Sequence, residues 1–253
     1  MTRFQGKTAL VSGGFGTIGL AIGARLAREG ANVVLADIAQ NPPARVQEMA
    51  AAHVSLDVTS EDDWAKATAF AVDRYGSLDV LVNNAGILNK ASQLFDELKL
   101  DEWRQLFAVN VDGVLLGTQA GMRSMKVQGG GSIVNIASIA GYVGSKDNGS
   151  YGASKGAVRS LTKQAALSAA QAGYGVRVNA VHPGFVWTPL IEAKAVGRFG
   201  SVEAAQTAFR GMNPLNRIVG PDDVAAAVAF LASDDAAMIT GADLVVDGGR
   251  LIQ

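Results

Sequence analysis

Short apolar runs alternate with longer helical patterns along the whole chain, and this alternation is the feature that most limits how the chain can fold. Seven runs are nearly continuous in apolar residues, which is typical of strands buried on both faces. They span 8–11, 32–35, 54–56, 80–82, 132–136, 176–179 and 244–246. Helical patterns lie between them, at about 18–30, 62–74, 101–126, 151–171 and 222–232. This order predicts an α/β fold of the Rossmann type, a doubly wound parallel sheet of about seven strands with helices on both faces.

No repeat, low-complexity tract or Pro/Gly/Ser linker divides the 253 residues. We therefore expect one domain over 1–253, a length that buries a substantial core. One connection, 187–217, is longer than usual and predicts a lid or substrate-binding excursion. Its large apolar residues are Trp187, Leu190, Ile191, Phe199, Phe209 and Met212.

Composition is that of an ordinary soluble globule. The formal net charge is -1 and no block of like charge occurs, which argues against a nucleic-acid or anionic-membrane partner. The absence of cysteine excludes disulfides and thiolate metal sites, and it is typical of a reducing compartment. The chain begins with no apolar segment of signal-peptide length, and its most apolar helical pattern is shorter than the ~20 residues of a membrane span. We expect a cytoplasmic protein.

A glycine-rich stretch, SGGFGTIG at 12–19, follows the first predicted strand and opens the first predicted helix. In that context such a loop meets a pyrophosphate through backbone N–H groups and a helix N-terminus. It can be read from Gly14 as G-x-G-x-x-G or from Gly13 as G-x-x-G-x-x-G. The residues expected to bind the cofactor here are Gly13, Gly16, Thr17, Ile18 and Gly19.

Asp37 ends the second predicted strand, about 20 residues beyond this loop. A carboxylate at that place accepts hydrogen bonds from an adenosine ribose and repels a 2′-phosphate. The next residue is Ile38 rather than Arg or Lys. The sequence therefore predicts NAD(H) in preference to NADP(H).

Tyr151 and Lys155 are spaced i, i+4, so they project from one face of a predicted helix. A phenol titrates near 10, and a neighbouring ammonium favours its deprotonated form. Ser138 follows the fifth predicted strand, where it could donate a hydrogen bond to a substrate carbonyl. The three side chains together indicate acid–base chemistry at a substrate carbonyl.

Taken with Asn83-Asn84-Ala85-Gly86, Asn110 and Pro183-Gly184 leading to Thr188, these residues resemble the signatures of the short-chain dehydrogenase/reductase family, in its branch of about 250 residues. The resemblance runs nearly from end to end. It implies that Tyr151 is the general acid/base, that Lys155 lowers its pKa and holds the nicotinamide ribose, and that Ser138 orients the reacting group. Asn110 would anchor a water that passes the proton onward.

The resemblance also implies the remaining cofactor contacts. Asp57 and Val58 would flank the adenine, and Val186 and Thr188 would contact the carboxamide. The groove would be completed by Asn84, Ala85, Gly86, Pro183 and Gly184. Structural alternatives remain open: Asn83 and Asn84 could brace the sheet, and Asn110 could lie buried in a helix kink.

The glycine loop departs from the family pattern. Short members carry T-G-x-x-x-G-x-G, whereas this chain has Thr17 where the middle glycine is expected. The spacing of Gly13, Gly16 and Gly19 is more typical of the longer branch. We hypothesise that Gly16 supplies the flexibility one residue early and that Thr17 shapes the loop near the nicotinamide.

Neither His53 nor His182 has the sequence partners of a zinc site or a nucleophile triad, so no metal is predicted. His182 precedes Pro183 near the expected groove, and we assign it a structural role.

The substrate is expected to meet the loop 139–150 and the excursion after Thr188. The stretch 166–190, with NNAGIL at 83–88, resembles bacterial hydroxysteroid and secondary-alcohol dehydrogenases. We expect reversible hydride transfer between NAD(H) and a bulky, apolar secondary alcohol or ketone. Two alternatives are a 3-oxoacyl-thioester reductase, against which Asp37 argues, and a catalytically silent NAD-binding sensor or scaffold.

The resemblance further implies a homotetramer or homodimer built around 101–126 and 151–171. Small residues would let the backbones approach there, namely Ala153, Ala157, Ala165, Ala166, Ala169 and Ala170.

Overall fold

The computed structural model describes residues 2–89, 94–144 and 149–253, and its centre is a parallel sheet. The strand order is β3-β2-β1-β4-β5-β6-β7, doubly wound with its switch point between β1 and β4. The strands are β1 Thr8–Ser12, β2 Asn32–Asp37, β3 Ala52–Ser55, β4 Val80–Asn83, β5 Gly131–Ile136, β6 Val176–Pro183 and β7 Asp243–Val246. All seven predicted strands are confirmed, and His53 lies within β3 rather than before it.

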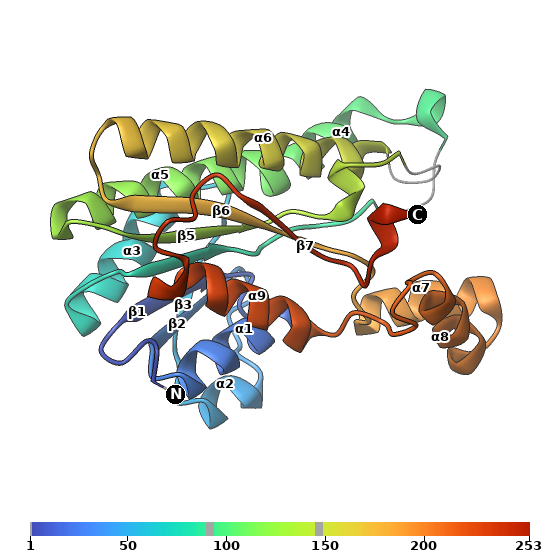
Figure 1. Ribbon diagram of the computed structural model, residues 1–253, viewed down its shortest axis with the longest axis horizontal. Helices are drawn as coiled ribbons and strands as arrows, with labels where there is room; N and C mark the ends of the chain where they lie inside the picture. Colours follow the sequence, from blue (N-terminus) through green and yellow to red (C-terminus); the bar gives the residue numbers. More distant parts are fainter. Residues whose placement is uncertain (1, 90–93, 145–148) are drawn as a thin grey trace.

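Helices cover both faces of this sheet, with α1 and α9 on one side and α3, α5 and α6 on the other (Figure 1). Their bounds are α1 Thr17–Arg28, α2 Ala44–Glu48, α3 Glu61–Tyr75, α4 Leu100–Phe107, α5 Gly113–Met125, α6 Gly149–Gln171, α7 Pro189–Phe199, α8 Val202–Gly211 and α9 Pro221–Ala232. The predicted Rossmann-type class is therefore confirmed.

The period of two along each strand explains why the strands look continuously apolar in sequence. In β1, Ala9 and Val11 pack in the cluster that contains Ile22 of α1. Leu10, between them, packs in the opposite cluster with Trp64 of α3. Both faces of the strand are thus buried, so neither face needs polar residues.

The prediction of one continuous helix over 101–126 is wrong. A π-helical turn, Ala108–Asp112, separates α4 from α5. Asn110 lies in this turn, fully buried, and its amide exchanges two hydrogen bonds with the backbone of Ile87. These bonds draw the side chain towards the β4 loop, and a π turn within a helix often marks such a functional position.

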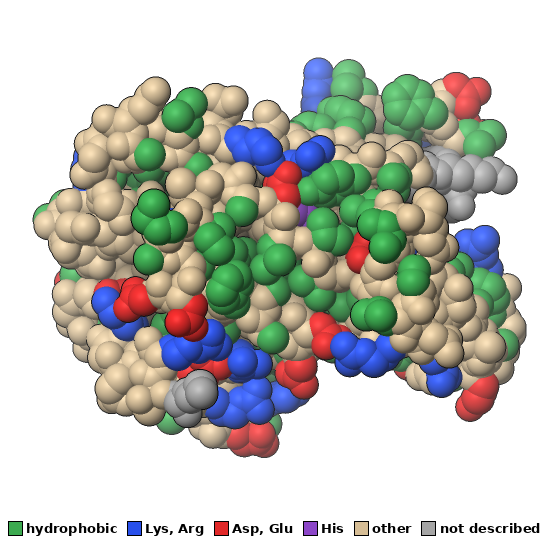
Figure 2. All heavy atoms as spheres, in the orientation of Figure 1, with side chains coloured by type: hydrophobic (Ala, Val, Ile, Leu, Met, Phe, Trp, Pro, Cys, Tyr) green, Lys and Arg blue, Asp and Glu red, His purple; other side chains and the backbone are tan. Residues whose placement is uncertain are grey.

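The excursion predicted over 187–217 forms the helices α7 and α8. Figure 1 places the pair beyond the end of the sheet, and the space-filling view in Figure 2 shows a hollow between it and the body. Its two ends meet, because Val186 and Val219 form an isolated parallel bridge and the Trp187 N–H donates to the Val219 carbonyl at 3.2 Å. The function of this pair as a lid stays a prediction.

Two of the alanines expected at a subunit contact are buried inside the protein. Ala166 and Ala169 point from α6 into the core beside the sheet, so their assignment to an interface is wrong. Ala153 and Ala170 lie on the exposed side of the same helix. None of the helices in the described ranges is long and apolar enough to cross a bilayer.

Candidate active site

A continuous groove runs along the carboxyl ends of the strands, built from two cavities that share a wall. The first, of about 620 Å³, is lined by Gly13, Gly16, Thr17, Ile18, Gly19, Asp37, Asp57, Val58, Asn84, Ala85, Gly86 and Thr188, among others. The second, of about 350 Å³, is lined by Ser138, Tyr151, Lys155, Pro183, Gly184 and Val186, among others. Every predicted site residue except Asn110 therefore lines this groove.

The glycine loop fills the floor of the first cavity. Gly13 has a φ of 60°, and a Cβ there would lie 2.8 Å from the Cα of Ala85. A Cβ on Gly19 would lie 2.3 Å from the Gly13 carbonyl. Gly16 is exposed, and a Cβ there would meet nothing nearer than 3.4 Å. Two glycines are thus needed for the fold of the loop, while Gly16 leaves the groove open.

The first turn of α1 is ready to receive an anion. Gly16 is its N-cap residue and supplies no side-chain cap, and the first turn contains no acidic residue. Backbone N–H groups at such an uncapped helix start need an external acceptor. The loop and helix therefore fit the pyrophosphate of a dinucleotide.

Two carboxylates line this cavity, at the positions where the sequence predicts contacts to adenosine. Asp37 accepts hydrogen bonds from the Phe15 N–H at 3.0 Å and the Ala39 N–H at 3.1 Å. Asp57 accepts from the N–H and the hydroxyl of Thr59. No Lys or Arg stands among the described residues of the lining, so this part of the groove carries negative charge.

The two asparagines after β4 divide their roles. Asn83 is buried and donates to Asn135 Oδ1 at 2.8 Å and to Thr118 Oγ1 at 3.2 Å, so it braces the sheet as the structural alternative proposed. Asn84 Nδ2 donates to the carbonyls of Ser12 and Gly13 at 2.9 and 3.0 Å. Asn84 therefore fixes the glycine loop and also lines both cavities.

Tyr151 and Lys155 project from the first turns of α6 into the second cavity. Lys155 Nζ lies 5.7 Å from the centre of the Tyr151 ring and donates to the Ile136 carbonyl at 2.8 Å. Burial lowers the pKa of Lys155 to about 8. Burial raises the pKa of Tyr151, and a hydrogen bond with Ser138 opposes that rise. The expected lowering of the Tyr151 pKa is thus absent from the protein alone.

Ser138 is held from two sides. Its hydroxyl accepts from the Ala140 N–H at 3.1 Å and caps the 3₁₀ turn that begins at Ile139. Its carbonyl lies 3.2 Å from Nδ1 of the fully buried His182. Ser138 therefore has a fixed backbone and a side chain at the cavity wall.

His182 in turn contacts Asp243, whose Oδ1 lies 3.1 Å from Nε2. Burial alone would raise the pKa of Asp243, but hydrogen bonds from Arg159 and Lys163 outweigh it and hold the pKa at about 2. Burial lowers the pKa of His182, against the raising influence of its two partners. Tyr142 packs edge-on against the imidazole at 4.9 Å.

Asn110 lies behind the groove rather than on its surface. Its Oδ1 accepts from the Ile87 N–H at 2.8 Å, and its Nδ2 donates to the Ile87 carbonyl at 3.0 Å and to Ser154 Oγ at 3.2 Å. The buried-kink alternative therefore describes its environment. Its part in moving a proton stays a prediction.

Sequence reasoning named His182 but missed its contact with Ser138, and it missed Arg250 altogether. The contact of His182 with Ser138 follows from the adjacency of β5 and β6, because residues that end neighbouring parallel strands lie together. Arg250, near the end of the chain, lines the second cavity. No local motif marks it, since only the return of the chain past β7 brings it there.

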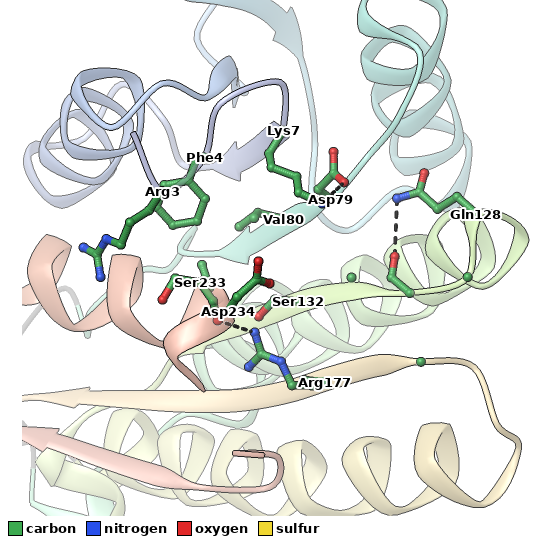
Figure 3. Close-up of a pocket in the computed structure, with 15 residues that line it drawn as sticks. Arg3, Phe4, Lys7, Asp79, Val80, Gln128, Ser132, Arg177, Ser233 and Asp234 are labelled. Carbon is green, nitrogen blue, oxygen red and sulfur yellow. Dashed lines mark hydrogen bonds and ion pairs between the residues drawn. The ribbon is translucent and has the colours of Figure 1, made fainter. Parts of the chain in front are cut away.

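A further cavity, of about 300 Å³, opens at the opposite, amino ends of the strands (Figure 3). Its cations already have protein partners: Lys7 lies 3.3 Å from Asp79, Arg177 donates to the carbonyls of Leu231 and Ser233, and Arg3 pairs with Glu29. The first contact joins the residues just before β1 and β4, the second joins β6 to the end of α9, and we assign these contacts to stability. In the described ranges, no group of three or more His, Cys, Asp or Glu could hold a metal ion.

Comparison with known proteins finds relatives over the full length of the chain. The family model described as Enoyl-(Acyl carrier protein) reductase matches residues 14–250. The NADP-dependent (R)-specific alcohol dehydrogenase of Lentilactobacillus kefiri is 40% identical, covering 99% of both chains. The 3-alpha-(or 20-beta)-hydroxysteroid dehydrogenase of Mycobacterium tuberculosis is 42% identical, covering 98% of this chain and 91% of the relative.

Among solved structures, the ligand-free aldohexose dehydrogenase of Thermoplasma acidophilum superposes with a TM-score of 0.90 at 35% identity. It covers all of this chain, which in turn covers 96% of it. The similarity therefore includes the sheet, both helical layers and the excursion.

Proposed function

The chain belongs to the short-chain dehydrogenase/reductase family, a family of nicotinamide-dinucleotide oxidoreductases, and we propose that it is an NAD-dependent dehydrogenase of bulky, apolar secondary alcohols. The relatives are alcohol and hydroxysteroid dehydrogenases, which supports oxidation of an alcohol to a ketone and its reversal. The finer proposal depends on the two cavities.

One observation carries the proposal: Ser138, Tyr151 and Lys155 meet at one wall of a cavity that is otherwise mostly apolar. Ser138 donates a hydrogen bond to the substrate oxygen, and Tyr151 takes the hydroxyl proton during oxidation or returns it during reduction. The nicotinamide, when bound, accepts or supplies the hydride. Ser138 and Tyr151 act on the same substrate oxygen and Lys155 acts through Tyr151, so the convergence of the three groups is what the chemistry requires.

The state of Tyr151 links the protein to its cofactor. Burial holds the phenol neutral in the protein alone, which suits the proton donor for ketone reduction. Deprotonation for alcohol oxidation needs positive charge beyond that of Lys155, which the oxidised nicotinamide would add when bound. Lys155, with its pKa of about 8, is itself charged at neutral pH.

Asp37 supports the preference for NAD(H). Its carboxylate faces the first cavity at the end of β2, and the neighbouring Ile38 is 69% exposed and uncharged. A 2′-phosphate would meet repulsion there and no basic partner among the described residues. Because the Lentilactobacillus relative is NADP-dependent by name, the two cofactors have to be compared directly.

The walls of the second cavity support a bulky substrate. Aliphatic and aromatic side chains surround the catalytic wall, and a volume of about 350 Å³ accommodates a ring-sized body. They are Ile87, Leu88, Ile139, Val143, Phe185, Leu190 and Ile191. The last two come from α7, so the α7–α8 pair would close over the substrate as a lid.

We also propose a cytoplasmic homotetramer or homodimer. The outer faces of α5 and α6 expose Leu115 and Leu167, at 41% and 56%. Burying such residues between subunits is favourable. Light scattering of the purified protein tests the assembly, and a monomer would contradict it.

The activity is tested by following the formation of reduced cofactor by absorbance over a panel of small, cyclic, aryl and steroid secondary alcohols. NAD and NADP are compared side by side. We expect turnover of the cyclic alcohols with NAD and its loss in Tyr151→Phe. A 3-oxoacyl thioester reduced faster with NADPH than any panel ketone with NADH would favour the reductase alternative. Tight NADH binding without any turnover would favour the sensor.

A further inference from the structure

The second cavity contains two cations and no acid. Among the described residues of its lining, Lys155 and Arg250 are the charged ones. Lys155 lies beside Tyr151, and its role is accounted for by the chemistry above. Arg250 is not used by that chemistry, so a positive charge remains at the wall of an otherwise apolar cavity.

The contacts of Arg250 leave most of its guanidinium free. Nη1 donates to the Met212 carbonyl at 3.1 Å, and Cζ lies 5.4 Å from the centre of the Phe185 ring. No carboxylate of the described residues lies within 4.0 Å of it, unlike Arg3, Arg159 and Arg217, which all form ion pairs. A guanidinium has five N–H donors, and one is engaged here.

Asp247 is the acidic residue nearest to Arg250 in sequence, and both of its carboxylate oxygens accept hydrogen bonds from backbone N–H groups. Its Oδ1 accepts from the Gly249 N–H and its Oδ2 from the Leu251 N–H, both at 2.8 Å. These bonds shape the turn that carries Arg250. Asp247 therefore fixes the position of the guanidinium without neutralising it.

A half-buried cation with free donors beside apolar walls recognises an anion that is attached to an apolar body. Guanidinium and carboxylate match in a planar, two-point geometry. We propose that Arg250 binds a carboxylate of the substrate while Ser138 and Tyr151 engage its hydroxyl. The substrate class is then a hydroxy acid with a cyclic apolar body between the two groups. This inference rests on the proposed function, which it sharpens.

The test compares the smallest ring that carries both groups with a neutral partner of the same shape. Oxidation of trans- and cis-4-hydroxycyclohexanecarboxylate by the full-length protein with NAD is measured beside oxidation of their methyl esters. The readout is the ratio of kcat/KM for acid over ester. In the wild type we expect the ratio to exceed one, by roughly tenfold or more, since hydrogen bonds to charged groups contribute that much.

Variants assign the effect to the side chain. Arg250→Gln removes the charge and keeps a donor for the Met212 carbonyl, and we expect the ratio to fall on the order of 10- to 100-fold. Arg250→Lys keeps the charge but loses the two-point geometry, so its ratio should lie between those of the wild type and Arg250→Gln. Arg198→Gln is the matched control, because Arg198 is exposed on α7 and lies 5.4 Å from the Phe199 ring but does not line the cavity. Its ratio should equal the wild-type value.

The outcomes separate this inference from the proposed function. Turnover of esters with no preference for acids, or an acid-to-ester ratio that Arg250→Gln leaves unchanged, overturns the inference alone. An equal loss on acid and ester, with a lower melting temperature, assigns Arg250 to structure and also overturns it. If no alcohol is turned over, the proposed function fails, and calorimetric binding of cyclohexanecarboxylate decides. Binding that Arg250→Gln weakens by tenfold or more supports the inference, and binding that does not depend on Arg250 overturns it.

Discussion

The two cavities of the groove carry opposite charge, and in both the charged side chains are hydrogen-bonded by backbone groups. The first contains Asp37 and Asp57, each accepting a backbone N–H. The second contains Lys155 and Arg250, each donating to a backbone carbonyl. In the described part of both linings, backbone groups orient the charges, and no opposite charge lines the same cavity. The comparison teaches that all four side chains are held in place yet keep their charge for a ligand.

The largest effect on activity is expected from Tyr151→Phe, which leaves the contrast in charge between the two cavities intact. Removing the hydroxyl deletes the proton transfer at the substrate end and leaves the charge of both cavities unchanged. We expect turnover to fall on the order of 10²- to 10⁴-fold, with NADH affinity within about threefold of wild type by fluorescence titration. Retention of more than a tenth of the activity would contradict the role of Tyr151.

Asp37→Asn breaks the acidic end. The single amide oxygen can still accept from the Phe15 N–H, so the glycine loop keeps its support, while the charge and the hydrogen bond from the Ala39 N–H are lost. We expect the preference for NAD over NADP, measured as a ratio of kcat/KM, to fall about 10- to 100-fold. The acid-to-ester ratio of the substrate should stay constant, and an unchanged cofactor ratio would refute the assignment of Asp37.

Lys155→Met should raise the free energy of unfolding and lower the activity. Folding lowers the pKa of Lys155 from 10.5 to about 8, so wild-type stability rises with pH between about 8 and 10.5, and the burial penalty is fully present below 8. That penalty is about 3 kcal/mol, and losing the hydrogen bond to the Ile136 carbonyl offsets about 1 kcal/mol.

We therefore expect Lys155→Met to gain about 2 kcal/mol at pH 7 by urea unfolding and to lose the rise above pH 8. Alcohol oxidation should be strongly impaired in the same variant. A destabilised variant at pH 7 would show that the buried ammonium is compensated by groups other than the Ile136 carbonyl.

Asp243→Asn probes the support behind Ser138. Folding lowers the pKa of Asp243 from 3.8 to about 2, so its contribution is present above pH 3.8 and is lost as the pH falls towards 2. We expect the variant to lose about 2 kcal/mol at pH 7 and to show a flatter stability profile between pH 4 and 2. Asp101→Asn, at a nearly fully exposed carboxylate, is the control and should change neither.

The smallest effect is expected from Thr17→Gly, which restores the usual glycine of the short branch. Thr17 is the first residue of α1 and lines the first cavity. Because Gly16 already leaves the groove open, we expect only a small change in NADH affinity or turnover, about two- to threefold. Values indistinguishable from wild type would remove any functional role for Thr17.

The strands, the two helical layers and the groove could be predicted from sequence because each depends on local pattern. Strands such as 8–11 are apolar throughout, and the glycine loop lies between a strand and a helix. The interruption at Asn110 was open only as an alternative, a buried helix kink, because the periodicity of 101–126 predicts a continuous helix and does not show that an amide is drawn onto the backbone of Ile87. Propensity describes a helix, whereas a single pair of tertiary hydrogen bonds changed its winding.

The sequence also did not show which face of α6 packs against the sheet. Ala166 and Ala169 belong to the same small-residue pattern as Ala153 and Ala170, but the helix turns the first pair to the sheet and the second pair to the surface. Arg250 was missed for a different reason: its neighbours Phe185 and Met212 are distant in sequence. The charge that Arg250 brings to the cavity can therefore be recognised only in the structure.

The bridge between Val186 and Val219 marks the place where the segment 187–218 could be replaced by another. The chain leaves the body and returns to it at one place, so 187–218 can lengthen, shorten or be replaced while the sheet keeps its register, at a closure cost that grows slowly with length. Arg250 lies outside that segment. The segment nevertheless contains Met212, whose carbonyl accepts from Arg250. Grafting the corresponding segment of a relative would therefore alter the shape that the pocket accepts, and it would keep the arginine in place only if the graft offers a backbone carbonyl where Met212 does.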